Sequence, residues 1–138
     1  MNIRFYIKII FCLLTAKFVF AEVIDVNNEE MIKLSNVNIP IVDVRRSSEW
    51  HQTGVIPNSI LLTFFDEEGN YNFDEWYEKL QLEINVTDPI ILICRSGKRS
   101  KVVANMIDEK FNTIIYNAQS GMNSWISEKL MTVEPQTN

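Results

Sequence analysis

The stretch CRSGKRS, residues 94–100, has the residue types that point most directly to chemistry. Cys94 follows an apolar run, and three cations lie within the next five positions: Arg95, Lys98 and Arg99. Gly97 carries no side chain and tolerates positive φ, so neighbouring N–H groups can converge on one point. Converging N–H groups and cations favour a thiolate, which is the nucleophilic form of cysteine. The stretch therefore predicts a reactive thiol that receives an anionic substrate.

The elements around this loop are expected to place it at the edge of a sheet. Residues 89–94 form the most apolar expected strand, and residues 98–111 form an expected helix. The face of that helix expected to point inward carries Val102, Val103, Met106, Ile107 and Phe111. A helix N-terminus offers unpaired N–H groups and partial positive charge, and ligands of parallel sheets bind beyond the carboxyl ends of strands. The order strand, cysteine, loop and helix thus predicts an anion site.

The same residues fit a simpler interpretation, in which a basic surface loop lies beside a buried, inert cysteine. The coincidence of a strand end, a cysteine, a glycine and a basic helix start favours the reactive thiol over that interpretation. No Cys/His set in the sequence suits a metal, and no glycine-rich dinucleotide loop or CxxC motif is present. We therefore expect neither a metal nor a cofactor.

The rest of the chain alternates between strand-like and helix-like segments. Strands are expected at 22–25, 39–44, 59–64, 89–94 and 113–117, and helices or helical turns at 27–35, 47–54, 73–84, 98–111 and 121–130. Continuously apolar strands alternating with helices predict an α/β fold, with a mostly parallel central sheet covered by helices on both faces. The tail from residue 131 onward has no such pattern and is expected to be loose.

The first 21 residues have the pattern of a secretory signal peptide. Arg4 and Lys8 precede a short apolar core at 9–16, and Val19-Phe20-Ala21 fits a cleavage site. The alternative is a retained membrane anchor, but Lys17 interrupts the apolar run well short of the roughly 20 residues that a spanning helix needs. We expect a signal peptide at 1–21, one domain at 22–138 and a secreted or periplasmic protein, with no membrane contact after cleavage.

The expected mature protein is acidic and has a single thiol. The formal net charge is −5, and removing the three cations of residues 1–21 lowers it to −8. This charge disfavours nucleic acid and anionic membranes as partners. Cys12 would leave with the signal, so Cys94 could form no disulfide within the chain.

Four motifs, taken in order, resemble the rhodanese family of single-domain thiosulfate sulfurtransferases. They are IVDVRRSSEW (41–50), HQTGVIPNSILL (51–62), CRSGKRS (94–100) and QSGMNSWISEKL (119–130). The resemblance runs from about residue 23 to 130. Val55 and Ser120 depart from it, since many members have a histidine and a glycine there, and neither position lies in the cysteine loop.

The resemblance implies a two-step reaction. Cys94 would attack the outer sulfur of thiosulfate, release sulfite and carry a persulfide, which cyanide or a thiol would then take. The loop residues Arg95, Ser96, Gly97, Lys98 and Arg99 would bind the substrate. Arg99 could fork two hydrogen bonds to the thiosulfate oxygens, while Arg95 and Lys98 would attract anions at the rim. The partners expected are therefore small-molecule donors and acceptors; the sequence does not predict an oligomeric state.

Several polar residues outside the loop have supporting or structural interpretations. Asp43 ends a buried strand on the same edge as Cys94 and could orient the loop or Arg45. Arg45 and Glu49 could form an ion pair, although such surface pairs are usually weak. His51 is expected on a surface helix, and a thiolate formed by the loop needs no base. The tryptophans are expected in the core or rim, and Trp50 could line the pocket mouth.

Two other function classes remain open on the sequence. Cysteine phosphatases and arsenate reductases also use a cysteine, a cradle loop and an arginine, but their arginine follows after five intervening residues. Here that position is Ser100, and Arg99 follows after four. The third possibility is a non-catalytic module that carries persulfide or docks a partner, and turnover with a small thiol acceptor would separate it from a catalyst.

Overall fold

A computed structural model describes residues 22–136 of the 138-residue chain. Ten elements alternate along it: β1 (Val23–Val26), α1 (Asn28–Asn36), β2 (Ile41–Asp43), α2 (Ser47–Thr53), β3 (Ile60–Leu61), α3 (Phe73–Glu83), β4 (Ile90–Ile93), α4 (Lys98–Lys110), β5 (Ile115–Ala118) and α5 (Gly121–Ser127). Asn27 caps α1 by accepting a hydrogen bond from the Glu30 N–H, as its position before an acidic first turn predicts.

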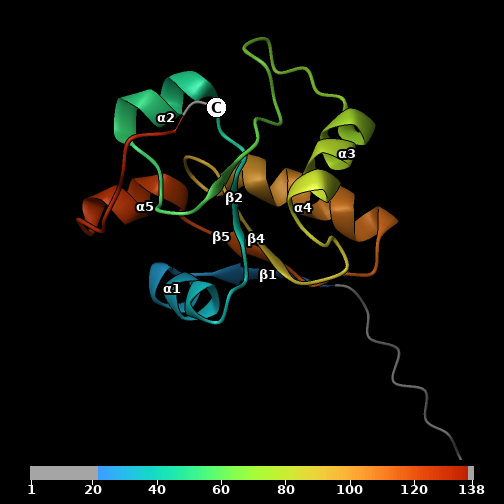
Figure 1. The fold of residues 1–138 in the computed structure, drawn as a ribbon, viewed down its shortest axis with the longest axis horizontal. Coiled ribbons are helices and arrows are strands. Elements are labelled where there is room, and N and C mark those ends of the chain that lie inside the picture. The colour runs from blue at the N-terminus through green and yellow to red at the C-terminus, as the bar shows by residue number, and fades with distance from the viewer. Residues whose placement is uncertain (1–21, 137–138) are drawn as a thin grey trace, which may run out of the picture.

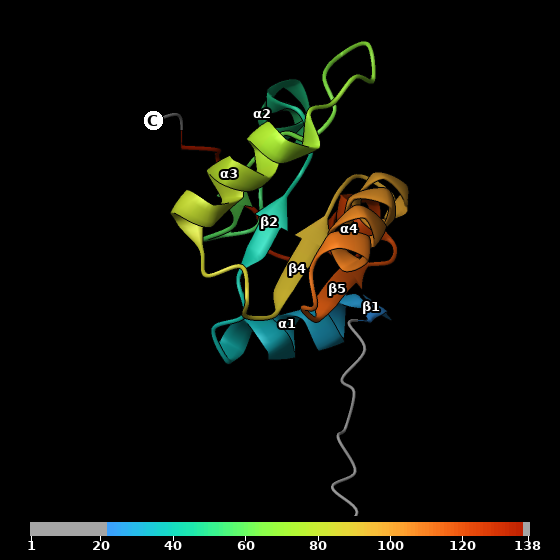
Figure 2. The same ribbon diagram turned by 90° about the vertical axis from the view of Figure 1, so that its right-hand side faces the viewer.

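The strands form one five-stranded sheet in the order β1-β5-β4-β2-β3, with every pair parallel. Figure 1 shows α1 and α5 on one side of this sheet and α3 and α4 on the other. Figure 2 looks onto the side that α3 and α4 cover. The predicted α/β fold, with a parallel sheet covered on both faces, is confirmed.

The alternation of side chains along β4 divides the core into two clusters. Ile90 and Leu92 pack under α3 and α4, whereas Ile91 and Ile93 pack with α1 and α5. Because successive residues of a strand point to opposite faces, Cys94 falls on the face of α3 and α4. The side chains of β4 are packed on both of its faces, and this close packing places the loop after the strand firmly.

The structure corrects two details of the sequence prediction. The third strand is shorter than the expected 59–64, although the N–H groups of Leu62 and Phe64 still bond to the carbonyls of Asp43 and Val44. Val102 was expected inward on α4, but it is exposed. Phe111, also expected inward, is partly exposed, whereas Val103 and Ile107 are buried as expected, because the contact with the sheet is narrower than the apolar stripe.

The C-terminal tail is not loose as expected. Val133 forms an isolated antiparallel bridge with Val55, with both N–H···O bonds at 2.9 Å. Val55, which departs from the family pattern, is therefore buried and paired through its backbone.

The predicted signal peptide lies outside the described residues and stays a prediction. Within residues 22–136, no helix has both the length and the apolar character needed to cross a membrane. In the same part of the chain, no group of three or more histidine, cysteine, aspartate or glutamate side chains is placed to bind a metal.

Candidate active site

Cys94 lies immediately after β4, at the carboxyl edge of the sheet. Its side chain is 0 % exposed and forms no disulfide. The Gly97 N–H donates a hydrogen bond to Sγ at 3.1 Å, and Ser100 Oγ lies 3.3 Å from the same sulfur. The sulfur is therefore in contact with two polar groups, the Gly97 N–H of the loop and the Ser100 hydroxyl in the first turn of α4.

Gly97 gives the loop its shape. Its φ is +87°, in the left-handed region that favours glycine, and it forms the N-cap of α4. A Cβ atom here would also collide with the carbonyl of Gln119, the residue that directly follows β5. The predicted need for a glycine therefore has two causes: the backbone angle and the close approach of the segment after β5.

The N-terminus of α5 holds the outer side of the loop. The N–H groups of Met122 and Asn123 donate to the carbonyls of Cys94 and Arg95, both at 2.9 Å. Gly121 permits this approach, because a Cβ atom there would collide with the Cys94 carbonyl. The glycine-methionine segment thus turns the loop carbonyls toward α5.

Several polar groups of the loop remain available to a ligand. Within residues 22–136, the N–H groups of Ser96, Lys98 and Arg99 find no hydrogen-bond acceptor. Arg95 and Lys98 are exposed, and neither joins a salt bridge within that range. The loop therefore offers N–H groups and two uncompensated cations beside the sulfur.

Arg99, by contrast, has a partner. Its two terminal nitrogens donate to the Glu49 carboxylate of α2 at 2.9 and 2.6 Å. Burial works against the charge of Glu49, but hydrogen bonds from Arg99 and the Arg46 N–H hold its pKa below the ordinary value overall. The bond to Glu49 raises the pKa of Arg99. The pair is therefore fully ionised at neutral pH and ties α4 to α2.

The expected ion pair between Arg45 and Glu49 is wrong. Arg45 is 1 % exposed and binds the Asp43 carboxylate through Nε and Nη2, with a shortest distance of 2.7 Å. Its other bonds go to Thr53 Oγ1 and to the carbonyls of Glu49 and Gly54. Arg45 precedes α2 rather than lying within it, so four-residue spacing does not bring it to the Glu49 carboxylate. Asp43 orients Arg45, as one of its two expected roles.

Sequence reasoning missed three polar residues behind the sulfur. Ser100 Oγ lies 2.6 Å from Asn117 Oδ1, and Asn117 Nδ2 donates to Asp25 Oδ1 at 2.9 Å. Ser100 and Asn117 are buried, whereas Asp25 reaches the surface and pairs with Lys101. A buried asparagine within an apolar strand is the only signal that could have pointed to this row.

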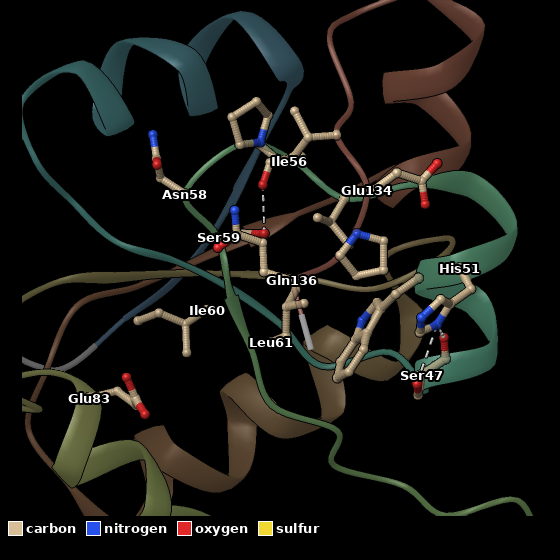
Figure 3. A pocket seen from close by; sticks show the side chains of 15 residues that line it. Ser47, His51, Ile56, Asn58, Ser59, Ile60, Leu61, Glu83, Glu134 and Gln136 are labelled. Carbon is tan, nitrogen blue, oxygen red and sulfur yellow. Dashed lines mark hydrogen bonds between the residues drawn. The ribbon is translucent and has the colours of Figure 1, made fainter. Parts of the chain in front are cut away.

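A separate groove lies along α2 and β3. Figure 3 shows its lining, which includes Ser47, His51, Glu83 and Glu134. Its volume is about 720 Å³, and no residue of the Cys94 loop lines it. Trp50 also lines this groove, and exposed His51 bonds to its own helix at Ser47. The candidate site is therefore identified by the polar geometry around Cys94 and not by this groove.

Comparison with known proteins agrees with this geometry. The model of the rhodanese-like domain matches residues 27–128, nearly all of the described chain. The chain belongs to the rhodanese-like domain family. This rhodanese-like chain is 34% identical, over 128 residues, to an uncharacterized protein of Buchnera aphidicola, and the match covers 93% of this chain and 81% of that one.

Solved structures share the rhodanese-like fold. Rv0390 from M. tuberculosis superposes with a TM-score of 0.62 at 27% identity, over 73% of this chain and 80% of that one. The polysulfide-sulfur transferase homodimer from Wolinella succinogenes gives a TM-score of 0.60 at 20% identity, over 84% and 82%. The likeness to the second protein shows the fold alone.

Proposed function

We propose that this protein is a thiosulfate sulfurtransferase that works through a persulfide on Cys94. The observation that carries the proposal is the environment of Sγ at the end of β4. Sγ accepts a hydrogen bond from the Gly97 N–H. Within residues 22–136, other N–H groups of the loop and the cations Arg95 and Lys98 have no partner. Such a cradle suits an incoming anion and the persulfide anion that remains after transfer.

The chemistry proceeds in two balanced steps. The Cys94 thiolate attacks the outer sulfur of thiosulfate, and the bond between the two sulfur atoms breaks as sulfite leaves with its electron pair. An acceptor thiolate or cyanide then attacks the outer sulfur of the persulfide, which regenerates the Cys94 thiolate. Exposed Arg95 and Lys98 attract the donor. Arg99 uses only two of the five N–H donors of its guanidinium to bind Glu49, so the remaining N–H groups can bind thiosulfate oxygens.

Intact-mass measurement tests the proposal. Thiosulfate should add one sulfur atom to Cys94, excess cyanide should remove it, and Cys94→Ser should abolish the adduct while the protein stays folded. Repeated turnover with excess cyanide, followed as thiocyanate release, distinguishes a catalyst from a persulfide carrier. An unmodified Cys94 together with clear hydrolysis of aryl phosphates would replace the sulfurtransferase with a phosphatase.

A further inference from the structure

A row of polar side chains leads from the sulfur to the surface. It runs from Cys94 Sγ to Ser100 Oγ (3.3 Å), on to Asn117 Oδ1 (2.6 Å), and from Asn117 Nδ2 to Asp25 Oδ1 (2.9 Å). Lys101 closes the row with a bond of 3.0 Å to Asp25. Ser100 is 0 % and Asn117 2 % exposed, so within the protein each depends on its neighbours for hydrogen bonds.

The partners of Asn117 fix the direction of its amide. A hydrogen bond from Asn117, followed by one from Lys101, holds the pKa of Asp25 below its ordinary value, so this carboxylate can only accept at neutral pH. The Gly97 carbonyl, 3.4 Å from Nδ2, is also only an acceptor. The NH₂ group must therefore face Asp25 and Gly97, and the oxygen Oδ1 must face Ser100.

This arrangement leaves Ser100 with one proton and two possible acceptors. With its proton on the short bond to Asn117 Oδ1, Ser100 presents a lone pair to the sulfur. A Cys94 thiol can satisfy that lone pair by donating its own proton. A thiolate cannot, because it has no proton and would face a lone pair instead of a donor.

We propose that Asn117 is a positioning residue that controls the direction of the Ser100 hydroxyl: Ser100 accepts a hydrogen bond from Cys94 while Cys94 is a thiol, and it turns to donate one once Cys94 is a thiolate. The turn breaks no covalent bond; the thiol proton leaves to solvent, and the Ser100 O–H rotates from Asn117 to the sulfur. The proposal deepens the proposed sulfur transfer and rests on it, since the thiolate is the attacking form.

The charged groups around the sulfur do not duplicate this role. On α2 and α4, Glu49 and Arg99 neutralise each other. At the end of β2, Asp43 and Arg45 do the same. Arg95 and Lys98 are exposed, and on the far side of the row Asp25 is paired with Lys101. The pairs and the two free cations supply a field that stays constant while the neutral Ser100 hydroxyl changes direction.

Two substitutions should shift thiolate formation in opposite directions. Asn117→Ala removes the competing acceptor, so Ser100 is free to donate to sulfur, and the midpoint of thiolate formation should fall by about 0.5 to 1 pH unit. Ser100→Ala removes the donor, so the midpoint should rise by a similar or larger amount. In the double variant the midpoint should equal that of Ser100→Ala, because Asn117 acts only through Ser100.

Thiolate ultraviolet absorbance, titrated on the full chain with Cys94→Ser as the blank, measures the midpoint without a sulfur donor. Asn28→Ala is the matched control: this asparagine is also buried and bonds to Ser124 on the other face of the sheet, so its loss should leave the midpoint unchanged. Asn117→Leu, which refills the volume, should shift the midpoint as Asn117→Ala does and keeps the test open if the alanine variant unfolds.

Shifts of the same sign for Asn117→Ala and Ser100→Ala, no shift in either folded Asn117 variant, or a double variant that differs from Ser100→Ala would each overturn the inference. These outcomes are separate from the mass measurement. A persulfide on the wild type together with same-sign shifts would refute the role of Asn117 alone. Opposite shifts without any persulfide would refute the thiosulfate reaction and leave the hydroxyl turn in place.

Discussion

Strands β2 and β4 lie side by side in the sheet, and both end near an arginine, yet their ends differ. After β2, Arg45 is buried and every polar edge of its guanidinium meets an acceptor: Asp43, Thr53 or a carbonyl of the α2 end. After β4, Arg95 and Lys98 reach solvent, and loop N–H groups are without acceptors within residues 22–136.

This difference in hydrogen bonding distinguishes a strand end that stabilises the fold from one that can bind a ligand. A charge whose bonds are all satisfied internally has nothing left for a ligand and serves the fold. A loop that keeps donors unpaired costs stability in the free protein and can bind an anion without first breaking other bonds. Arg99 lies between these cases, because Glu49 engages part of its guanidinium and leaves the rest free.

The largest effect, on stability, should come from the end of β2, where the polar groups are paired within the protein. Arg45→Met leaves the Asp43 carboxylate buried without its partner, and we expect it to lower the free energy of unfolding by about 3–5 kcal/mol, measured by urea denaturation. Lys79→Met, which breaks an exposed pair with Glu75, should cost far less, because solvent screens that pair. Equal losses in the two variants would mean that the β2 end is no more structural than the surface.

Arg99 should give an intermediate effect, mainly on activity. Arg99→Ala should slow persulfide formation by about 10- to 100-fold, because the substrate loses one or two charge-assisted hydrogen bonds. Arg99→Lys should recover little, because lysine cannot form a fork. Glu49→Gln keeps the guanidinium and should retain most of the rate. If Glu49→Gln is as slow as Arg99→Ala in stopped-flow thiosulfate assays, Arg99 serves only to hold α2.

The smallest effect, on the rate of reaction, should come from the exposed cations of the loop after β4. Lys98→Ala should reduce the rate of reaction with thiosulfate a few-fold at low salt and leave it nearly unchanged at high salt, where exposed charges are screened. Lys33→Ala, on the solvent-facing side of α1, is the matched control and should have no effect at either salt concentration. A salt-independent loss at Lys98 would indicate direct contact with the substrate rather than attraction from a distance.

The sequence predicted the parts of the fold that depend on neighbouring residues. The apolar run of β4, the cysteine at its end and the glycine before α4 form a local pattern, and the structure has all three in place. Partners distant in sequence were not predicted. Glu49 meets Arg99 across fifty positions and Asn117 meets Ser100 across seventeen, because the strand order brings them together. Where four-residue spacing was applied beyond a helix, at Arg45, the prediction was wrong.

The bonds from α5 to the Cys94 loop also constrain the order in which the protein can assemble. The carbonyls of Cys94 and Arg95 are satisfied by Met122 and Asn123, and Gly121 must pass directly against them. While residues 121–123 are still inside the ribosome, the carbonyls of Cys94 and Arg95 lack these hydrogen bonds. The sulfur of Cys94 therefore acquires these surroundings only after residues 121–123 have been made, when almost the whole rhodanese-like domain is present to enclose it.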